Sequence, residues 1–141
     1  MESSVEKLLE SEGLLGNSAF VIRVPKAGEL MTMNQRKHWS WVSKQKRAWR
    51  DATCTVAMGT PGLVFPNAGF RSIVRCVLPV TQLRRRDPHN YYPTVKPIVD
   101  GLVDAGVWPD DTPDFVETRE PMFAICDSAY IVIHKKDGTI S

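Results

Sequence analysis

Cysteine is scarce in this sequence, and the features of secreted and membrane-spanning chains are missing. The 141 residues, enough for one domain with one core, include three cysteines, Cys54, Cys76 and Cys126, that lie far apart and form no C-x-x-C pair. Such a set indicates buried thiols in a reducing cytoplasm rather than a disulfide framework or a zinc site. No apolar run approaches the roughly 20 residues of a membrane helix. The acidic amino terminus also lacks the basic-then-apolar order of a secretion signal, so we expect a cytoplasmic protein.

Acidic residues are nearly absent from the middle of the chain. Residues 20–86 contain thirteen Lys or Arg and only two acids, whereas residues 87–141 contain ten acids and four bases. The net charge of +2 hides this division. Because Lys and Arg neutralise phosphates, a polyanion is the expected partner, with carboxylates gathered beside the surface that binds it. The alternative is a bipolar charge distribution that forms no site.

Alternating and helical patterns predict an α+β fold. Alternation of apolar and polar residues predicts four strands, at 18–25, 70–80, 115–123 and 129–134. Helical spacing predicts one helix from Ser40 to about Met58, and a second through 95–106 that is capped by Thr94 and has Pro97 in its first turn. The order β-α-β-α-β-β predicts a small mixed sheet with two helices packed on one face. Residues 1–17 are expected to be a loosely attached acidic appendage to a domain formed by residues 18–141.

Residues 84–111, RRRDPHNYYPTVKPIVDGLVDAGVWPDD, combine arginines with aspartates. Three arginines, Arg84, Arg85 and Arg86, run into Asp87, and the predicted helix then delivers Asp110 and Asp111. A crossover of this kind can bring its two ends together, so Asp87 and Asp111 could share a hard divalent cation, which takes carboxylates, waters and a substrate phosphate. Arginines beside the cation would hold phosphate oxygens. The combination predicts metal-assisted hydrolysis of a phosphodiester.

Each element of this segment also has a plainer interpretation. An arginine run is often a solvated surface, and an Asp-Asp pair is often a turn or a helix cap. Lys96 and Asp100 lie four residues apart, so they can simply form an ion pair on one helix. The joint arrangement is more specific than any of these elements.

The same segment resembles the core motif of the RusA family of Holliday junction resolvases, especially the bacteriophage versions. That motif is a basic run ending in R-D, then x-D-N, a Lys one turn before a D-A-L helix, A-G-x-W and D-D. A looser likeness covers about residues 18–135, through MNQRKHW at 33–39 and the K-x-K-R-x-W-R helix. The resemblance implies a small α+β homodimer that binds four-way DNA junctions and cuts them symmetrically with Mg²⁺ or Mn²⁺, in recombination, repair or phage DNA processing.

The resemblance also implies roles for individual residues. Asp87 and Asp111 match the first and last catalytic aspartates, Lys96 matches the catalytic lysine, and Asn90 matches the Asn of the x-D-N triplet. With the basic middle of the chain, it leads us to expect DNA contacts from a set of nine residues: Arg84, Arg85, Arg86, Asn90, Arg36, Lys37, Lys44, Arg47 and Arg50.

Two departures from the family pattern affect the metal ligands. His89 stands where the family has its middle aspartate, and three extra residues within Tyr91–Thr94 separate Asn90 from Lys96. His89 could itself bind the ion, which would favour Mn²⁺ and make activity fall at acid pH. Otherwise Asp110 supplies the missing carboxylate, a water fills the position, or the site is degenerate and only binds DNA. The expected ligands are therefore Asp87, Asp111, Asp110 and His89.

Tryptophans alternate with basic residues near the start of the first long helix, as in a base-stacking platform. Helical spacing explains Trp49, which we expect to pack on the sheet. Trp39 or Trp41 is then the candidate for contact with a base or sugar, and Trp108 is expected to pack beneath the Asp110–Asp111 loop. The rival functions are a non-catalytic DNA-binding protein on the same scaffold and a metal-dependent RNase or flap nuclease; a purely structural dimerisation module would not need the excess of positive charge.

Overall fold

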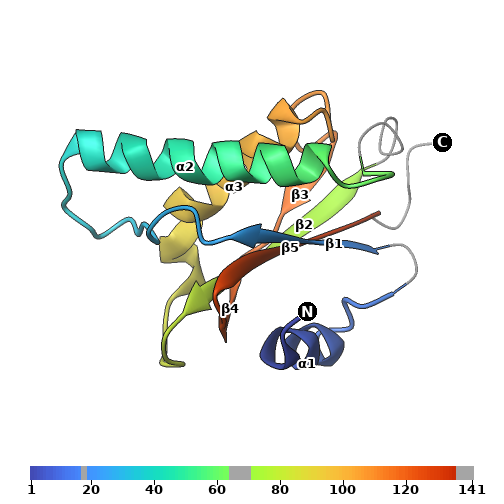
Figure 1. Cartoon of the computed structure of the whole chain (residues 1–141), viewed down its shortest axis with the longest axis horizontal. Coiled ribbons are helices and arrows are strands. Elements are labelled where there is room, and N and C mark those ends of the chain that lie inside the picture. Colours follow the sequence, from blue (N-terminus) through green and yellow to red (C-terminus); the bar gives the residue numbers. More distant parts are fainter. Residues whose placement is uncertain (17–18, 64–70, 136–141) are drawn as a thin grey trace.

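The computed structural model describes residues 1–16, 19–63 and 71–135, which form a sheet with helices on both of its faces (Figure 1). Its elements, in chain order, are α1 (Ser3–Ser11), β1 (Ala19–Pro25), α2 (Trp39–Met58), β2 (Ser72–Val80), the 3-10 helix η1 (Pro88–Tyr91), α3 (Tyr92–Asp104), β3 (Val116–Thr118), β4 (Met122–Ile125) and β5 (Ser128–Lys135). The α+β class and the mixed sheet are confirmed. Ser18 of the strand predicted at 18–25 and Phe70 of the strand predicted at 70–80 lie outside the described residues.

The sheet has five strands in the order β1-β5-β2-β3, and β4 pairs with the same edge of β2 as β3 does. β5 is antiparallel to both of its neighbours, β1 and β2. β3 and β4 run parallel to β2; β3 pairs with its beginning, at Ser72–Val74, and β4 with its end, at Val77–Val80. β2 is therefore paired on both sides and leads directly into the arginine run.

The two faces of the sheet carry separate apolar clusters, because successive side chains of a strand point to opposite faces. Val74, Cys76 and Leu78 of β2 belong to the larger cluster, which includes residues of α2 and α3. Val77 of β2 and Tyr130 of β5 belong to the smaller one, which includes residues of α1. As predicted, two helices cover one face of the sheet (Figure 1). No helix in the described part of the chain is long and apolar enough to cross a membrane.

The first helix is packed more firmly than its sequence suggests. Val5 and Leu9 of α1 are fully buried against the smaller cluster, and Ser4 donates a hydrogen bond of 2.9 Å to the carbonyl of Ile125. Arg75 of β2 also lies 3.7 Å from a carboxylate oxygen of Glu12. The expectation of loose attachment is corrected, because the apolar stripe of this short helix completes the core on its face of the sheet.

The third predicted strand, 115–123, is divided into β3 and β4 in the structure. Pro121 precedes β4 and has no backbone N–H to donate to a neighbouring strand, which explains a break at this point. The Arg119 amide still donates to the Val74 carbonyl at 3.0 Å. The single strand expected from the alternating pattern is therefore two short ones.

The second long helix begins earlier than predicted, because η1 continues directly into α3 at Tyr92. Pro93 lies in its first turn, where proline is tolerated, whereas Pro97 lies in the second turn. Thr94 is buried inside the helix and does not cap it. Its hydroxyl donates to the Met31 carbonyl at 2.9 Å and accepts from the Met31 amide at 2.6 Å. Thr94 therefore anchors the loop before α2 onto α3.

The two long helices approach each other closely at Gly101 of α3. A Cβ atom added there would lie 2.5 Å from the Arg50 carbonyl oxygen and 2.9 Å from the Thr53 Cβ. The first contact is with backbone, which cannot rotate aside as a flexible side chain can. The distance between α2 and α3 therefore depends on the missing side chain at position 101.

We expect Gly101→Ala to lower the free energy of unfolding by about 1–3 kcal/mol, because overpacking outweighs the higher helix propensity of alanine. Urea unfolding followed by circular dichroism measures this change. Gly59→Ala, at the end of α2, is the matched control, since the nearest atoms to its Cβ lie at 3.6 Å. A Gly101→Ala protein as stable as the wild type would contradict the close approach.

Candidate active site

Two aspartates of the predicted motif, Asp100 and Asp111, meet at Lys96. Its ammonium donates a hydrogen bond of 2.8 Å to the Asp100 carboxylate and a second, shorter one to the Asp111 carboxylate. Lys96 and Asp100 lie one turn apart on α3, as the spacing predicts, whereas Asp111 comes from the loop that follows the helix. The structure thus brings two predicted catalytic residues, Lys96 and Asp111, into direct contact.

The end of α3 explains how Asp111 returns to the helix. Gly106 has a φ of +87°, and the amides of Gly106 and Val107 donate to the carbonyls of Val103 and Leu102. This is the Schellman arrangement, which reverses the chain after a helix and favours glycine at the left-handed position. Trp108 then fixes the reversed chain, since its side chain is buried and its Nε1 donates to the Ser72 hydroxyl at 3.0 Å.

The hydrogen bonds from Lys96 to Asp100 and Asp111 shift the pKa of Lys96 and that of Asp111 in opposite directions. Partial burial on its own would lower the pKa of Lys96, but the hydrogen bonds to the two carboxylates outweigh it and raise that pKa above its usual value. The hydrogen bond from Lys96 also lowers the pKa of Asp111. At neutral pH Lys96 is therefore a cation and Asp111 an anion, so Lys96 is suited to stabilising negative charge and not to accepting a proton.

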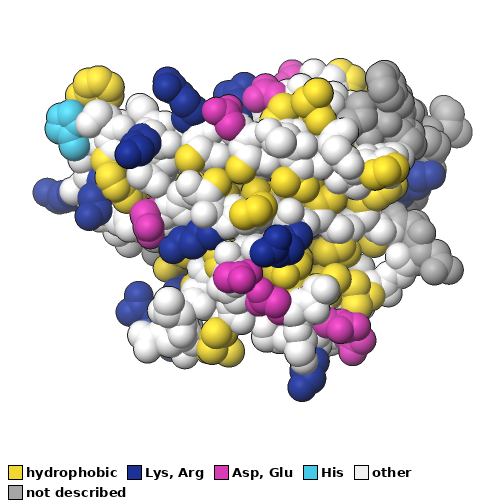
Figure 2. Space-filling view, viewed as in Figure 1, with side chains coloured by type: hydrophobic (Ala, Val, Ile, Leu, Met, Phe, Trp, Pro, Cys, Tyr) yellow, Lys and Arg dark blue, Asp and Glu magenta, His cyan; other side chains and the backbone are white. Residues whose placement is uncertain are grey.

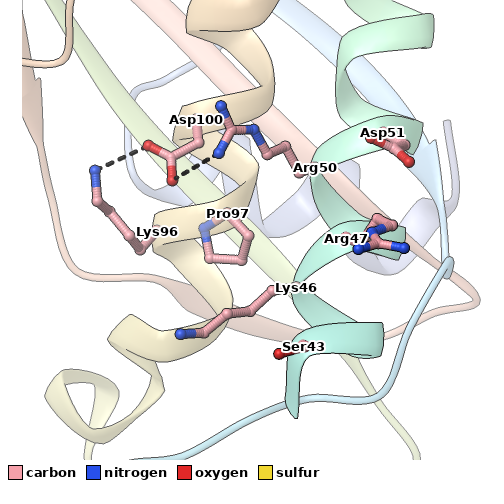
Figure 3. Close-up of a pocket in the computed structure, with 8 residues that line it drawn as sticks. All are labelled: Ser43, Lys46, Arg47, Arg50, Asp51, Lys96, Pro97 and Asp100. Carbon is pink, nitrogen blue, oxygen red and sulfur yellow. Dashed lines mark hydrogen bonds and ion pairs between the residues drawn. The ribbon is translucent and has the colours of Figure 1, made fainter. Parts of the chain in front are cut away.

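Arg50 extends this cluster from α3 to α2. Its guanidinium donates two hydrogen bonds, of 2.6 and 2.8 Å, to the Asp104 carboxylate, and it lies 3.9 Å from Asp100. These contacts raise the pKa of Arg50 and lower that of Asp104. Figure 3 shows Asp100 between Lys96 and Arg50. Because Arg50 is already held by Asp104, it positions the cluster as well as being a predicted DNA contact.

A cleft of about 700 Å³ lies between α2 and α3 beside this cluster. In Figure 3, Lys46 and Arg50 extend from α2 toward α3, which contributes Lys96 and Asp100. Arg47 lines the α2 side of the cleft. Lys and Arg side chains gather over the end of the molecule where α2 begins (Figure 2). The cleft therefore combines Lys96 and Asp100 of α3 with three cations and one acid, Asp51, of α2.

The first predicted catalytic aspartate, Asp87, caps η1. Its Oδ1 accepts a hydrogen bond of 3.1 Å from the His89 amide. His89 is exposed beside a small cavity of about 210 Å³ that Tyr92 also lines. Asn90 contributes its carbonyl, which accepts from the Met33 amide at 2.9 Å. Asp87, His89 and Asn90 therefore lie at the start of or within η1, which leads into α3.

The arginine run lines a different groove from the Lys96 cleft. Arg84 and Arg86 border this second groove together with Lys26 and Gln35, while Arg85 is exposed. Arg86 donates a hydrogen bond of 3.0 Å to the Gln82 carbonyl and lies 5.6 Å from the centre of the Phe123 ring. The described part of the chain thus has one basic surface along α2 and another after β2.

Binding of a metal ion requires that side chains able to coordinate it lie close together. Within residues 1–16, 19–63 and 71–135, no three His, Cys, Asp or Glu side chains gather closely enough to hold one ion. The four predicted ligands therefore do not form a single set in this structure, and Asp110 instead accepts a hydrogen bond of 2.8 Å from the Asp111 amide. Two carboxylates, Asp100 and Asp111, do converge, and the Lys96 ammonium lies where they meet. One or two carboxylates and a phosphate satisfy Mg²⁺, so this pair fits a hard divalent ion in kind.

The role of Asp104 in the cluster was not predicted from the sequence. The available signal was the spacing of Lys96, Asp100 and Asp104, which places all three along one side of a helix. Trp49 and Trp108, which were both predicted to pack inside the protein, are buried.

No protein-family model matches this chain, and no curated protein matches it.

Replacing Lys96 should release Asp111. In Lys96→Met the ammonium that lowers the pKa of Asp111 is lost, so we expect that pKa to rise toward its ordinary value near 3.8. Carboxyl ¹³C chemical shifts followed through a pH titration measure it. Lys26→Met, which removes a lysine paired with Glu29 in a different part of the molecule, is the control and should leave Asp111 unchanged. An unaltered Asp111 titration in Lys96→Met would contradict the ion pair.

Proposed function

We propose that this protein is a metal-dependent endodeoxyribonuclease that cuts branched DNA, with four-way junctions as its main substrate, as the resemblance to RusA resolvases implies. A homodimer would present two sites to the two opposed strands of a junction, which gives paired, symmetric nicks. Such an enzyme would act in the cytoplasm, in recombination, repair or phage DNA processing.

One observation carries the proposal: the contact of Lys96 with Asp111 and Asp100 at the border of a cleft lined by basic residues of α2. Phosphodiester cleavage needs a place for cations, a positive group beside the scissile phosphate and further positive groups for its neighbours. The carboxylates, Lys96 and the α2 residues Lys46 and Arg47 supply these three features at one cleft. A bipolar charge distribution without a site does not require this convergence.

Acidic and basic residues have different roles in the proposed reaction. Asp111 and Asp100 would hold a divalent cation, which when bound supplies Lewis-acid stabilisation of the charge that develops on phosphorus. Lys96 has three N–H donors, of which two point to Asp100 and Asp111, so a third can serve a phosphate oxygen. Lys46 and Arg47 hold neighbouring phosphates, and Arg50 keeps α3 aligned with α2 through Asp104. Phosphate contacts carry no base code, so recognition rests on DNA shape.

A second candidate is a structure-specific DNA-binding protein without nuclease activity. It is favoured by the finding that, among the described residues, no third acid or histidine joins Asp100 and Asp111 around one point. Such a DNA-binding protein would use the same basic surfaces and would prefer junctions as strongly as the proposed nuclease does. Cleavage of a synthetic four-way junction in the presence of Mn²⁺ separates the two candidates.

We expect Asp111→Asn to abolish cleavage of a labelled four-way junction while junction binding stays within about two-fold, because the amide removes a negative ligand and little surface. The assay is run with Mg²⁺, Mn²⁺ and Ca²⁺ in parallel, and Asp87→Asn is tested beside it. Asp114→Asn, the same change at an exposed position three residues away, is the matched control and should cut normally. Wild-type cutting by Asp111→Asn would overturn the assignment of the site.

Binding should weaken steeply as salt rises, because several phosphates are neutralised at once. In Lys46→Met, the slope of log K against log[salt] should fall by about one, since one phosphate contact is lost. Filter binding or fluorescence anisotropy on a junction in Ca²⁺ measures the slope. Lys7→Met, on the exposed side of α1, should leave the slope as it is. If the affinity of the wild type did not change with salt, the basic surface would not be the surface that binds DNA.

A further inference from the structure

Trp39 is unusually exposed for an aromatic residue of its size. It is the first residue of α2, and 74% of its surface is accessible, whereas Trp49 and Trp108 are buried. The imidazole of His38 lies beside it, with 5.5 Å between ring centres and an angle of 33° between the planes. His38 is itself held by the Ser40 hydroxyl and amide. A flat apolar surface is thus presented to solvent at a fixed position on a long helix.

A continuous surface connects Trp39 with the Lys96 cleft. A second hollow, of about 390 Å³, is lined by Trp39, Lys44 and Arg47. It shares Ser43, Arg47 and Asp51 with the cleft that reaches Lys96. The two hollows therefore form one groove along α2, from the proposed catalytic residues to the exposed indole.

The length of this groove suits a short stretch of one DNA strand. Arg50 follows Trp39 by eleven residues on α2, so the rise of about 1.5 Å per residue separates them by about 16 Å. A stacked strand advances about 3.4 Å per nucleotide, so up to about five nucleotides span this distance. A base that left the Lys96 cleft along α2 would reach Trp39 within those five.

The charges along the groove favour a nucleic acid strand over a protein partner. Five cations line it, against two acids, Asp51 and Asp100; the cations are Lys44, Lys46, Arg47, Arg50 and Lys96. Lys37 lies 5.4 Å from the centre of the Trp41 ring, which adds a further cation near the start of α2. A positively charged groove combined with an exposed aromatic side chain is the arrangement by which proteins hold single strands.

We propose that one strand of the DNA runs from Lys96 along α2 and stacks an unpaired base on Trp39. This inference rests on the proposed function for the identity of the partner, and it adds the path of the strand and a position at which the DNA must be unpaired. Stacking on Trp39 then favours DNA in which bases near the cut are free, as they are at the centre of an opened junction.

The test uses photocrosslinking in Ca²⁺, so that it does not depend on cleavage. Four-way junctions carry a single 5-iododeoxyuridine at successive positions within five nucleotides of the centre, and the crosslinked peptide is identified by mass spectrometry. We expect a crosslink to Trp39 at one or two of these positions. Trp39→Phe keeps a stacking surface and should still crosslink, whereas Trp39→Ala should lose the adduct and bind the junction about ten-fold more weakly.

Met58→Ala is the matched control, because Met58 is 68% exposed at the other end of the same helix and should change neither crosslinking nor affinity. Crosslinks at Trp41 in place of Trp39, or Trp39→Ala affinity within two-fold of the wild type, would overturn the inference while leaving the nuclease proposal in place. So would a change of oligomeric state in Trp39→Ala, or preference for single-stranded RNA over the junction. A wild-type protein that binds no DNA would overturn both.

Discussion

The approach of α3 to α2 at Gly101 is the constraint on which the site depends. Because residue 101 has no side chain, the backbone of α3 can lie against the Arg50 carbonyl. The same approach brings the guanidinium of Arg50 to Asp104 and close to Asp100. Asp100 in turn holds Lys96, which holds Asp111. A packing contact between two helices thus determines where the charges of the proposed site lie.

The charges in this cluster do not balance. Three carboxylates, Asp100, Asp104 and Asp111, face two cations, Lys96 and Arg50, so one negative charge is left over. Excess negative charge at one point attracts a cation, while the neighbouring residues of α2 attract phosphate. The proposed function needs these opposite preferences side by side, and the cleft between α2 and α3 offers both.

The periodic spacing of apolar residues predicted the helices and strands well, but it carried no information about contacts between them. The helical spacing around Trp49 and the alternation of Val74, Cys76 and Leu78 gave the correct faces, because burial of one face is what creates such patterns. The i, i+4 spacing likewise predicted the pair of Lys96 with Asp100. The tie between Arg50 and Asp104 joins residues 54 positions apart, and the burial of Thr94 depends on the Met31 backbone, so neither was visible in a local pattern. The convergence of Asp111 on Lys96 was only partly visible, since it requires the chain reversal at Gly106.

In the proposed function, the carboxylates of Asp100 and Asp111 bind the divalent ion that cleavage requires. Paramagnetic broadening of amide signals by substoichiometric Mn²⁺, recorded on the full chain without DNA, locates that ion directly. The account predicts that broadening begins at residues around Asp100 and Asp111 and is lost from both in Asp111→Asn. Broadening centred on another acidic region, such as Glu117–Glu120, or unchanged in Asp111→Asn, would contradict it.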